Sequence, residues 1–156
     1  MLSWLESTSL ALWLRESPSI WALPTVLTLH TAGMAVLVGT SWMLDLRLLG
    51  VGRHVPLSAY RWVFPTLAVG LFVNFVTGVL LFIKNPTTWG TAMPFLVKML
   101  LVVASVATLV PVRSLILRSD AAQRDVSRNV RLLAIASILA WTGAVTAGRL
   151  LAYLVP

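Results

Sequence analysis

The sequence predicts an all-α integral membrane protein, a four-helix bundle preceded by a short N-terminal interfacial helix. Of its 156 residues, 58% are hydrophobic and only 11% are charged, whereas an average soluble domain has about 25% charged residues. The mean hydropathy is +0.90. Several apolar stretches also reach the roughly 20 residues that a helix needs to cross about 30 Å of hydrocarbon. These observations exclude a typical water-soluble globule.

Residues 1–19 mix apolar and charged side chains, including Trp4, Trp13, Arg15 and Glu16. Tryptophan prefers the headgroup layer, where one edge of the ring stays in contact with water. We therefore expect an amphipathic helix that lies on the membrane surface.

Residues 20–156 form one predicted domain with spans at about 20–50, 61–83, 94–117 and 132–153. Prolines near the start of the first and third spans suit a first helical turn, where a missing N–H costs little. The polar turn Lys84-Asn85-Pro86 ends the second span. The polar stretch 118–131 separates the last two spans.

The chain contains twelve Lys and Arg against five acidic residues, a net charge of +7. Eight of the twelve belong to the loops after the first and third spans or to the span ends beside them. Cytoplasmic loops of membrane proteins carry such an excess of Lys and Arg. We therefore expect a bacterial inner membrane protein with basic loops in the cytoplasm and both termini outside. The charge has a topological explanation, so no nucleic-acid partner is expected.

Each span carries one strong polar group in its outer half: His30, Asn74, Lys98 and Arg149. Ionisable groups inside a membrane are expensive, and they mark functional sites by default. At 1.5 Å per residue, the first two lie deepest and the two cations are shallower. Thr142, Thr146, Arg149 and Tyr153 form one stripe on the fourth span. We expect these groups to meet around a cavity that opens toward the outside.

Haem b suits this arrangement, because its iron takes a neutral imidazole and its propionates need cations nearer the aqueous face. In this interpretation His30 is the metal ligand, Lys98 and Arg149 hold the propionates, and Asn74 completes the cavity floor. Gly33 shares the face of His30 and lets a flat macrocycle approach the backbone. His54 belongs to the opposite loop, so the second axial ligand is a non-histidine residue, comes from another subunit, or is absent.

Other interpretations stay open for the same residues. His30 and Asn74 also fit hydrogen bonding between helices, and both cations are shallow enough to extend to lipid headgroups. His30 together with Met34, Met93 or Met99 would suit Cu(I), which favours soft ligands. Asp45 is expected to pair with a loop arginine. The absence of cysteine excludes disulfides, thiolate zinc sites, iron–sulfur clusters and covalent c-type haem.

Four segments carry a resemblance to a known family: LHTAGM at 29–34, DLRLLG at 45–50, FLVK at 95–98 and TAGRL at 146–150. They resemble an uncharacterised family of four-span bacterial membrane proteins, known as a domain of unknown function. In outline the chain is also similar to membrane b-type cytochromes and to copper-resistance D-type proteins. That similarity implies haem binding or copper handling through histidines in the spans, although this chain has only one such histidine.

The leading functional hypothesis is a small haem protein that passes electrons between quinone and a periplasmic redox protein. No pairing of a nucleophile with a base is evident, so no residue is assigned as catalytic. An alternative is a non-catalytic anchor or assembly subunit of a larger respiratory or transport complex. Copper handling is a further alternative, and a homo-oligomer or a larger complex is expected in each case.

Overall fold

The computed structural model describes residues 3–119 and 126–154, and in these residues the chain is an all-α four-helix bundle. The four long helices are α3 (Leu23–Leu49), α4 (Val63–Lys84), α6 (Met93–Arg118) and α7 (Arg128–Leu154). Each is long and apolar enough to cross a membrane. The predicted fold class is confirmed at this level.

The helix boundaries differ from the predicted spans by a few residues, for local reasons. Helix α3 begins three residues later than expected, with Pro24 in its first turn. It ends at Gly50, which has a φ of 114° and donates to the carbonyl groups of Arg47 and Leu46. A short 3-10 helix, η1 (Leu57–Tyr60), precedes α4. Helix α7 begins four residues earlier than predicted, because its polar first turn continues the helix beyond the apolar stretch.

The N-terminal segment contains two short helices, α1 (Ser3–Glu6) and α2 (Ser9–Glu16), where one helix was expected. The break lies at Thr8, whose hydroxyl caps α2 by accepting from the Ala11 N–H at 3.3 Å. Leu14 of α2 is buried in a cluster with Val26 of α3 and Leu81 of α4. This segment therefore packs against the bundle through one apolar face.

A carboxylate also connects this segment to the short helix α5 (Pro86–Trp89). The Thr87 hydroxyl and the Thr87 N–H, the latter at 3.1 Å, both donate to Oε1 of Glu6. The side-chain bond, followed by the backbone bond, lowers the pKa of Glu6 from its ordinary value. The carboxylate is thus a side-chain cap for an otherwise uncapped helical turn.

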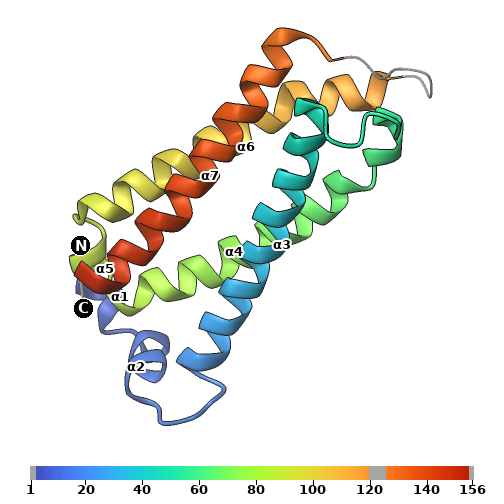
Figure 1. The fold of residues 1–156 in the computed structure, drawn as a ribbon. Coiled ribbons are helices and arrows are strands. Elements are labelled where there is room, and N and C mark those ends of the chain that lie inside the picture. Colours follow the sequence, from blue (N-terminus) through green and yellow to red (C-terminus); the bar gives the residue numbers. More distant parts are fainter. Residues whose placement is uncertain (1–2, 120–125, 155–156) are drawn as a thin grey trace.

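The long helices form two pairs, α3 with α4 and α6 with α7, which are joined by packing of α3 on α7. Helices α4 and α6 do not pack closely against each other. Both termini lie at one end of the bundle and η1 lies at the other (Figure 1). The main apolar core is at the η1 end, where Leu44, Leu48, Leu57, Val63 and Ile116 are fully buried.

Glycines set the distance between α3 and α4. A Cβ on Gly33 would lie 2.9 Å from Cγ1 of Val73, and a Cβ on Gly70 would lie 3.0 Å from the backbone nitrogen of Leu37. Small residues allow this close approach of backbones.

We expect Gly70→Ala to destabilise the protein by about 1–3 kcal/mol, because a backbone atom cannot move aside as a side chain can. Thermal unfolding in detergent measures the change. Gly39→Ala is the matched control, since a Cβ there meets nothing within 4 Å. Its stability should be unchanged or slightly higher, as alanine favours helix over glycine. Equal losses in both variants would contradict the close packing.

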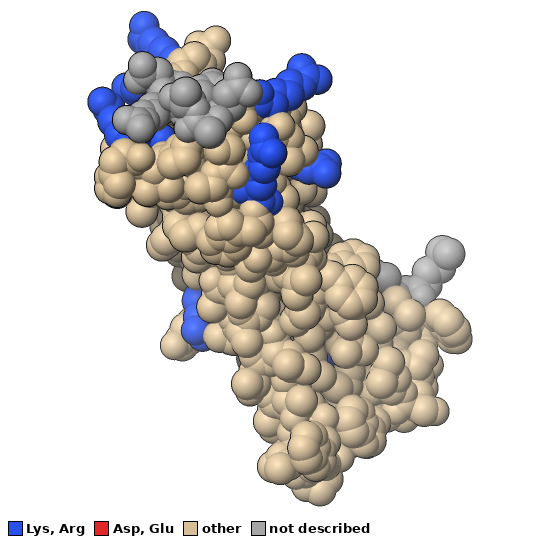
Figure 2. All heavy atoms as spheres, turned by 90° about the vertical axis from the view of Figure 1, so that its right-hand side faces the viewer, with Lys and Arg blue, Asp and Glu red and all other residues tan. Residues whose placement is uncertain are grey.

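Lys and Arg side chains gather at one end of the molecule (Figure 2). Two of these arginines bind backbone carbonyl groups. Arg47 is buried and donates from Nε and Nη2 to the carbonyl of Val55 at 2.9 and 2.7 Å. Arg61 donates from Nη2 to the carbonyl of Ser119 at 3.1 Å. The expected pairing of Asp45 with a loop arginine is absent from the described residues, where the ion pair found joins Arg15 and Glu16.

Candidate functional site

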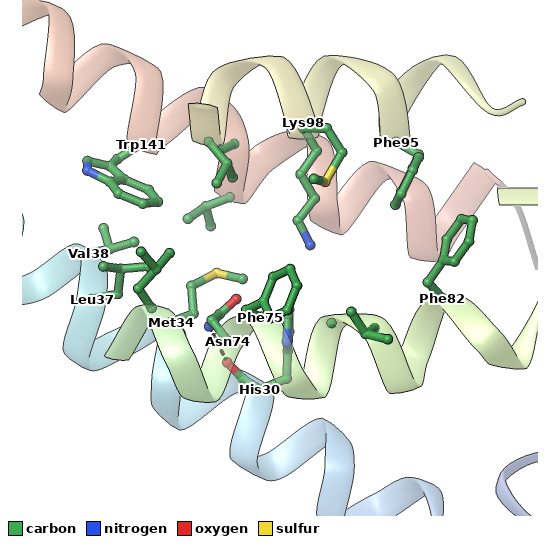
Figure 3. A pocket seen from close by; sticks show the side chains of 17 residues that line it. His30, Met34, Leu37, Val38, Asn74, Phe75, Phe82, Phe95, Lys98 and Trp141 are labelled. Atoms are coloured by element: carbon green, nitrogen blue, oxygen red, sulfur yellow. Dashed lines mark hydrogen bonds between the residues drawn. The ribbon is translucent and has the colours of Figure 1, made fainter. Parts of the chain in front are cut away.

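A cavity of about 280 Å³ lies among the four long helices, between the main core and the end that carries the termini (Figure 3). Pockets for small molecules are usually about 300–1,000 Å³. All four helices contribute to its mostly apolar lining, which includes His30 and Met34 of α3, Asn74, Phe75 and Phe82 of α4, Phe95, Lys98 and Met99 of α6, and Trp141 of α7.

His30 lines the cavity, and its imidazole is fixed by a neighbouring threonine. The Nδ1 atom lies 2.9 Å from Oγ1 of Thr77. The single hydroxyl proton of Thr77 is donated to the carbonyl of Val73 at 2.6 Å. We therefore assign the imidazole proton to Nδ1, which donates to Thr77. This assignment leaves a lone pair on Nε2, which has no hydrogen-bond partner in residues 3–119 and 126–154.

Asn74 joins two helices through the backbone. Its Nδ2 donates to the carbonyl of His30 at 2.9 Å, the dashed line in Figure 3. The amide thus holds the turn of α3 that carries the imidazole. Gly78, one turn further along α4, leaves room for that ring, because a Cβ there would lie 3.4 Å from Cε1 of His30.

Lys98 turns inward, with its ammonium group pointing from α6 into the cavity (Figure 3). Its side chain runs along α7 where Gly148 leaves space, since a Cβ on Gly148 would lie 3.6 Å from Nζ. No hydrogen bond or ion pair of Nζ is found in the described part of the chain. In this structure Lys98 therefore points into the cavity and does not extend toward the end of the bundle.

Two of the five predicted site residues do not line the cavity. Gly33 is buried, but it faces Val73 in the contact between α3 and α4. Arg149 is exposed, and so are Thr142, Thr146 and Tyr153 of the same stripe. The lining face of α7 instead carries Trp141, Ala144 and Val145. The expected pair of cations at the cavity mouth is thus reduced to one cation.

The cavity opens sideways, not toward the end with the termini as expected from the sequence. At that end Phe82 of α4 and Phe95 of α6 stack with ring centroids 5.1 Å apart. Its most exposed lining residues also belong to these two helices: Phe75 is 69% exposed and Met99 is 44% exposed. The opening therefore lies between α4 and α6, which do not pack closely against each other.

The thioether groups separate into two kinds. Met34 and Met99 line the cavity with His30, whereas Met93 is 71% exposed and does not. The described residues contain no group of three His, Asp or Glu side chains that could hold a metal ion. His54 is exposed beyond the opposite end of α3. A metal ion held here would therefore have one imidazole ligand, and its other ligands would be thioether groups or would come from outside the chain.

Sequence reasoning did not identify Thr77, Phe82, Phe95 or Gly148 as parts of the site. The spacing of Asn74, Thr77 and Gly78 at i, i+3 and i+4 does place all three on one helix face. No comparable signal marks Gly148, whose importance depends on how α6 and α7 are rotated toward each other. No protein-family model, curated protein or solved structure matches the chain.

Proposed function

We propose that this is a bacterial inner membrane protein that binds one haem b in the cavity and takes part in electron transfer. The observation that carries the proposal is the presence of two polar groups in one apolar cavity: an imidazole with an unpartnered Nε2 and an ammonium group with no partner in the described residues. A ligand that satisfies both groups must offer a metal or proton donor to one and an anion to the other.

The residues of the cavity fit haem in three respects. Thr77 holds Nδ1 of His30 as a donor, which is the arrangement that orients imidazole ligands of metals. Lys98 supplies a cation for a propionate, and such charge-assisted bonds are the strong ones. The remaining lining is apolar and aromatic. Since the cavity is open between α4 and α6, a flat macrocycle does not have to be enclosed completely. Met34 and Met99 also line the cavity and would place thioether groups beside the bound group.

Bound haem would supply a one-electron redox centre whose potential depends on its axial ligand and surroundings. The protein's own residues do the positioning. His30 would hold the iron and Lys98 would neutralise a propionate in an apolar environment, while Phe82 with Phe95 screens the cavity from the end with the termini. The lateral opening between α4 and α6 suits a membrane-soluble electron partner such as quinone, and a periplasmic redox protein would dock at the end with the termini.

The absorption spectrum of protein purified after expression with added haem precursor tests this proposal. A Soret band that corresponds to about one haem per chain is expected. A colourless protein would contradict the proposal, and a colourless protein recovered in a stoichiometric complex would favour the anchor or assembly subunit.

Copper handling is a second candidate, favoured by Met34 and Met99, which line the cavity together with His30. Thioether and imidazole groups are ligands that Cu(I) accepts. Competition with a coloured Cu(I) chelator distinguishes the two candidates. A copper protein should retain one Cu(I) per chain and lose it in a Met34→Leu/Met99→Leu double variant, whereas a haem protein should release copper to the chelator.

The proposed topology places both termini outside and the basic loops in the cytoplasm. The exposed rings of Trp4 and Trp21 then lie at the outer headgroup layer with α1 and α2. The excess of Lys and Arg at the η1 end supports this orientation.

Because the chain has no cysteine, single cysteines report the topology directly. Ser7→Cys and His54→Cys both lie at exposed positions at opposite ends. In intact spheroplasts, a membrane-impermeant maleimide should label Ser7→Cys and leave His54→Cys unlabelled until the membrane is opened. The reverse pattern would invert the topology, and labelling of both would show that α3, the long helix between the two positions, does not cross the membrane.

A further inference from the structure

Asp45 of α3 is a buried carboxyl group that the proposed haem site does not use. It is 2% exposed and lies between the cavity and the η1 end of the bundle. The hydroxyl groups of Ser41 of α3 and Ser137 of α7 lie beside it. Both serines are buried as well. Within the described chain, Oδ2 of Asp45 and Oγ of Ser137 have no hydrogen-bond partner.

No basic side chain neutralises this carboxyl group in residues 3–119 and 126–154. Arg47, two residues away, is directed to the carbonyl groups of Val55 and Arg53. Arg61, before α4, binds the carbonyl groups at the end of α6. Arg131, in the first turns of α7, forms no ion pair in these residues. An ionised carboxylate buried without a partner is very costly, so a group in this position takes up a proton or a cation instead.

The neighbours of Asp45 are hydrogen-bonding groups that connect it to the cavity. Oγ of Ser41 accepts from Nε1 of Trp141 at 3.0 Å, and the Trp141 ring lines the cavity (Figure 3). Since the indole N–H occupies a lone pair of Ser41, the hydroxyl proton of Ser41 remains free for Asp45. The carboxyl group is thus separated from the cavity by one hydrogen-bonded pair of side chains.

We propose that Asp45, with Ser41 and Ser137, is a proton-binding site in the interior of the bundle. The carboxyl group holds a proton on Oδ2 and is neutral. A proton satisfies the geometry better than a metal cation, because the four side-chain oxygen atoms of these residues, on two helices, supply fewer ligands than the six to eight, or the octahedral set, that hard cations take. The inference does not depend on haem binding in the cavity.

Infrared difference spectroscopy of haem-free protein tests the site. The spectrum of the wild type minus that of Asp45→Asn, at neutral pH, should contain the C=O band of one protonated carboxyl group, shifted in heavy water. Glu16→Gln is the control: Glu16 is an exposed partner of Arg15, so its difference spectrum should show a lost carboxylate band only. A carboxylate band for Asp45 would overturn the proposal. If sodium ions shift this band, the carboxylate binds a cation; if they do not, it forms an ion pair.

A second variant covers the case in which Asp45→Asn does not fold. Asp45, Asp120 and Asp125 are the three aspartates of the chain, so Asp120→Asn/Asp125→Asn retains Asp45 alone. Labelling this double variant with carboxyl-¹³C aspartate should move the protonated C=O band by the isotope shift. If the isotope shift appears only in carboxylate bands, Asp45 is ionised and the proposal fails.

Discussion

His30→Ala should abolish haem binding, with the Soret band of the wild type reduced to background. His30 is the only histidine that lines the cavity, and its Nε2 has a lone pair with no hydrogen-bond partner in the described residues. Asn74 cannot replace the imidazole as a ligand, because its side-chain amide donates a hydrogen bond to the carbonyl of residue 30. Haem content per chain, measured by absorbance on protein of the same purity, gives the result.

Two further variants show that the effect comes from ligation. His54→Ala should bind haem as the wild type does, because His54 is exposed at the opposite end. Thr77→Val keeps the shape of the side chain but removes the group that orients the imidazole. Such outer partners usually change metal affinity by about 10- to 100-fold, so Thr77→Val should weaken haem binding and change the position of the band. Equal haem content in His30→Ala and the wild type would exclude His30 as the ligand.

Lys98→Met should weaken haem binding by roughly 10- to 150-fold. Methionine is an unbranched apolar side chain that follows the same path past Gly148, so the variant removes the charge with little change in packing. A hydrogen bond to a charged group is worth about 1.5–3 kcal/mol, and each 1.4 kcal/mol changes the affinity tenfold. Titration of haem-free protein in detergent measures the dissociation constant.

Arg149→Met is the matched control, because the sequence predicted the same role for both cations. Arg149 is exposed and does not line the cavity, so its variant should bind haem with nearly the affinity of the wild type. Lys98→Arg should retain most of the affinity, since it keeps a cation at the same position. If Arg149→Met and Lys98→Met were weakened equally, propionate binding would occur outside the cavity described here.

The number and order of the long helices follow from the length and hydropathy of the apolar stretches. The end of α3 at Gly50, which adopts a positive φ, was also predicted. The starts of the helices were not, because short-range bonds decide them: Thr8, for example, starts the short helix α2 by capping it. The depth of each polar residue in its span was also predictable, since it depends only on the rise per residue of the helix. For this reason His30, Asn74 and Lys98 were placed together correctly.

The rotation of a helix about its axis was not predictable from polarity in the same way. On α7 the lining residues Trp141, Ala144 and Val145 begin one residue before the predicted stripe that starts at Thr142, and one residue turns a helix face by about 100°. Lipid is as apolar as the interface between helices, so hydrophobicity does not distinguish the lipid-facing side of a helix from the side that faces its neighbours. Arg149 was assigned to the wrong face on this account. The resemblance to a four-span family and the haem assignment stay predictions.

A density map of the haem-loaded protein shows directly whether the cavity holds the macrocycle. Density for a planar group should lie between α3 and α6, continuous with Nε2 of His30 and in contact with Nζ of Lys98, and should reach the opening between α4 and α6. Haem density elsewhere on the chain, or a cavity filled by the surrounding side chains with Lys98 turned outward, would contradict it.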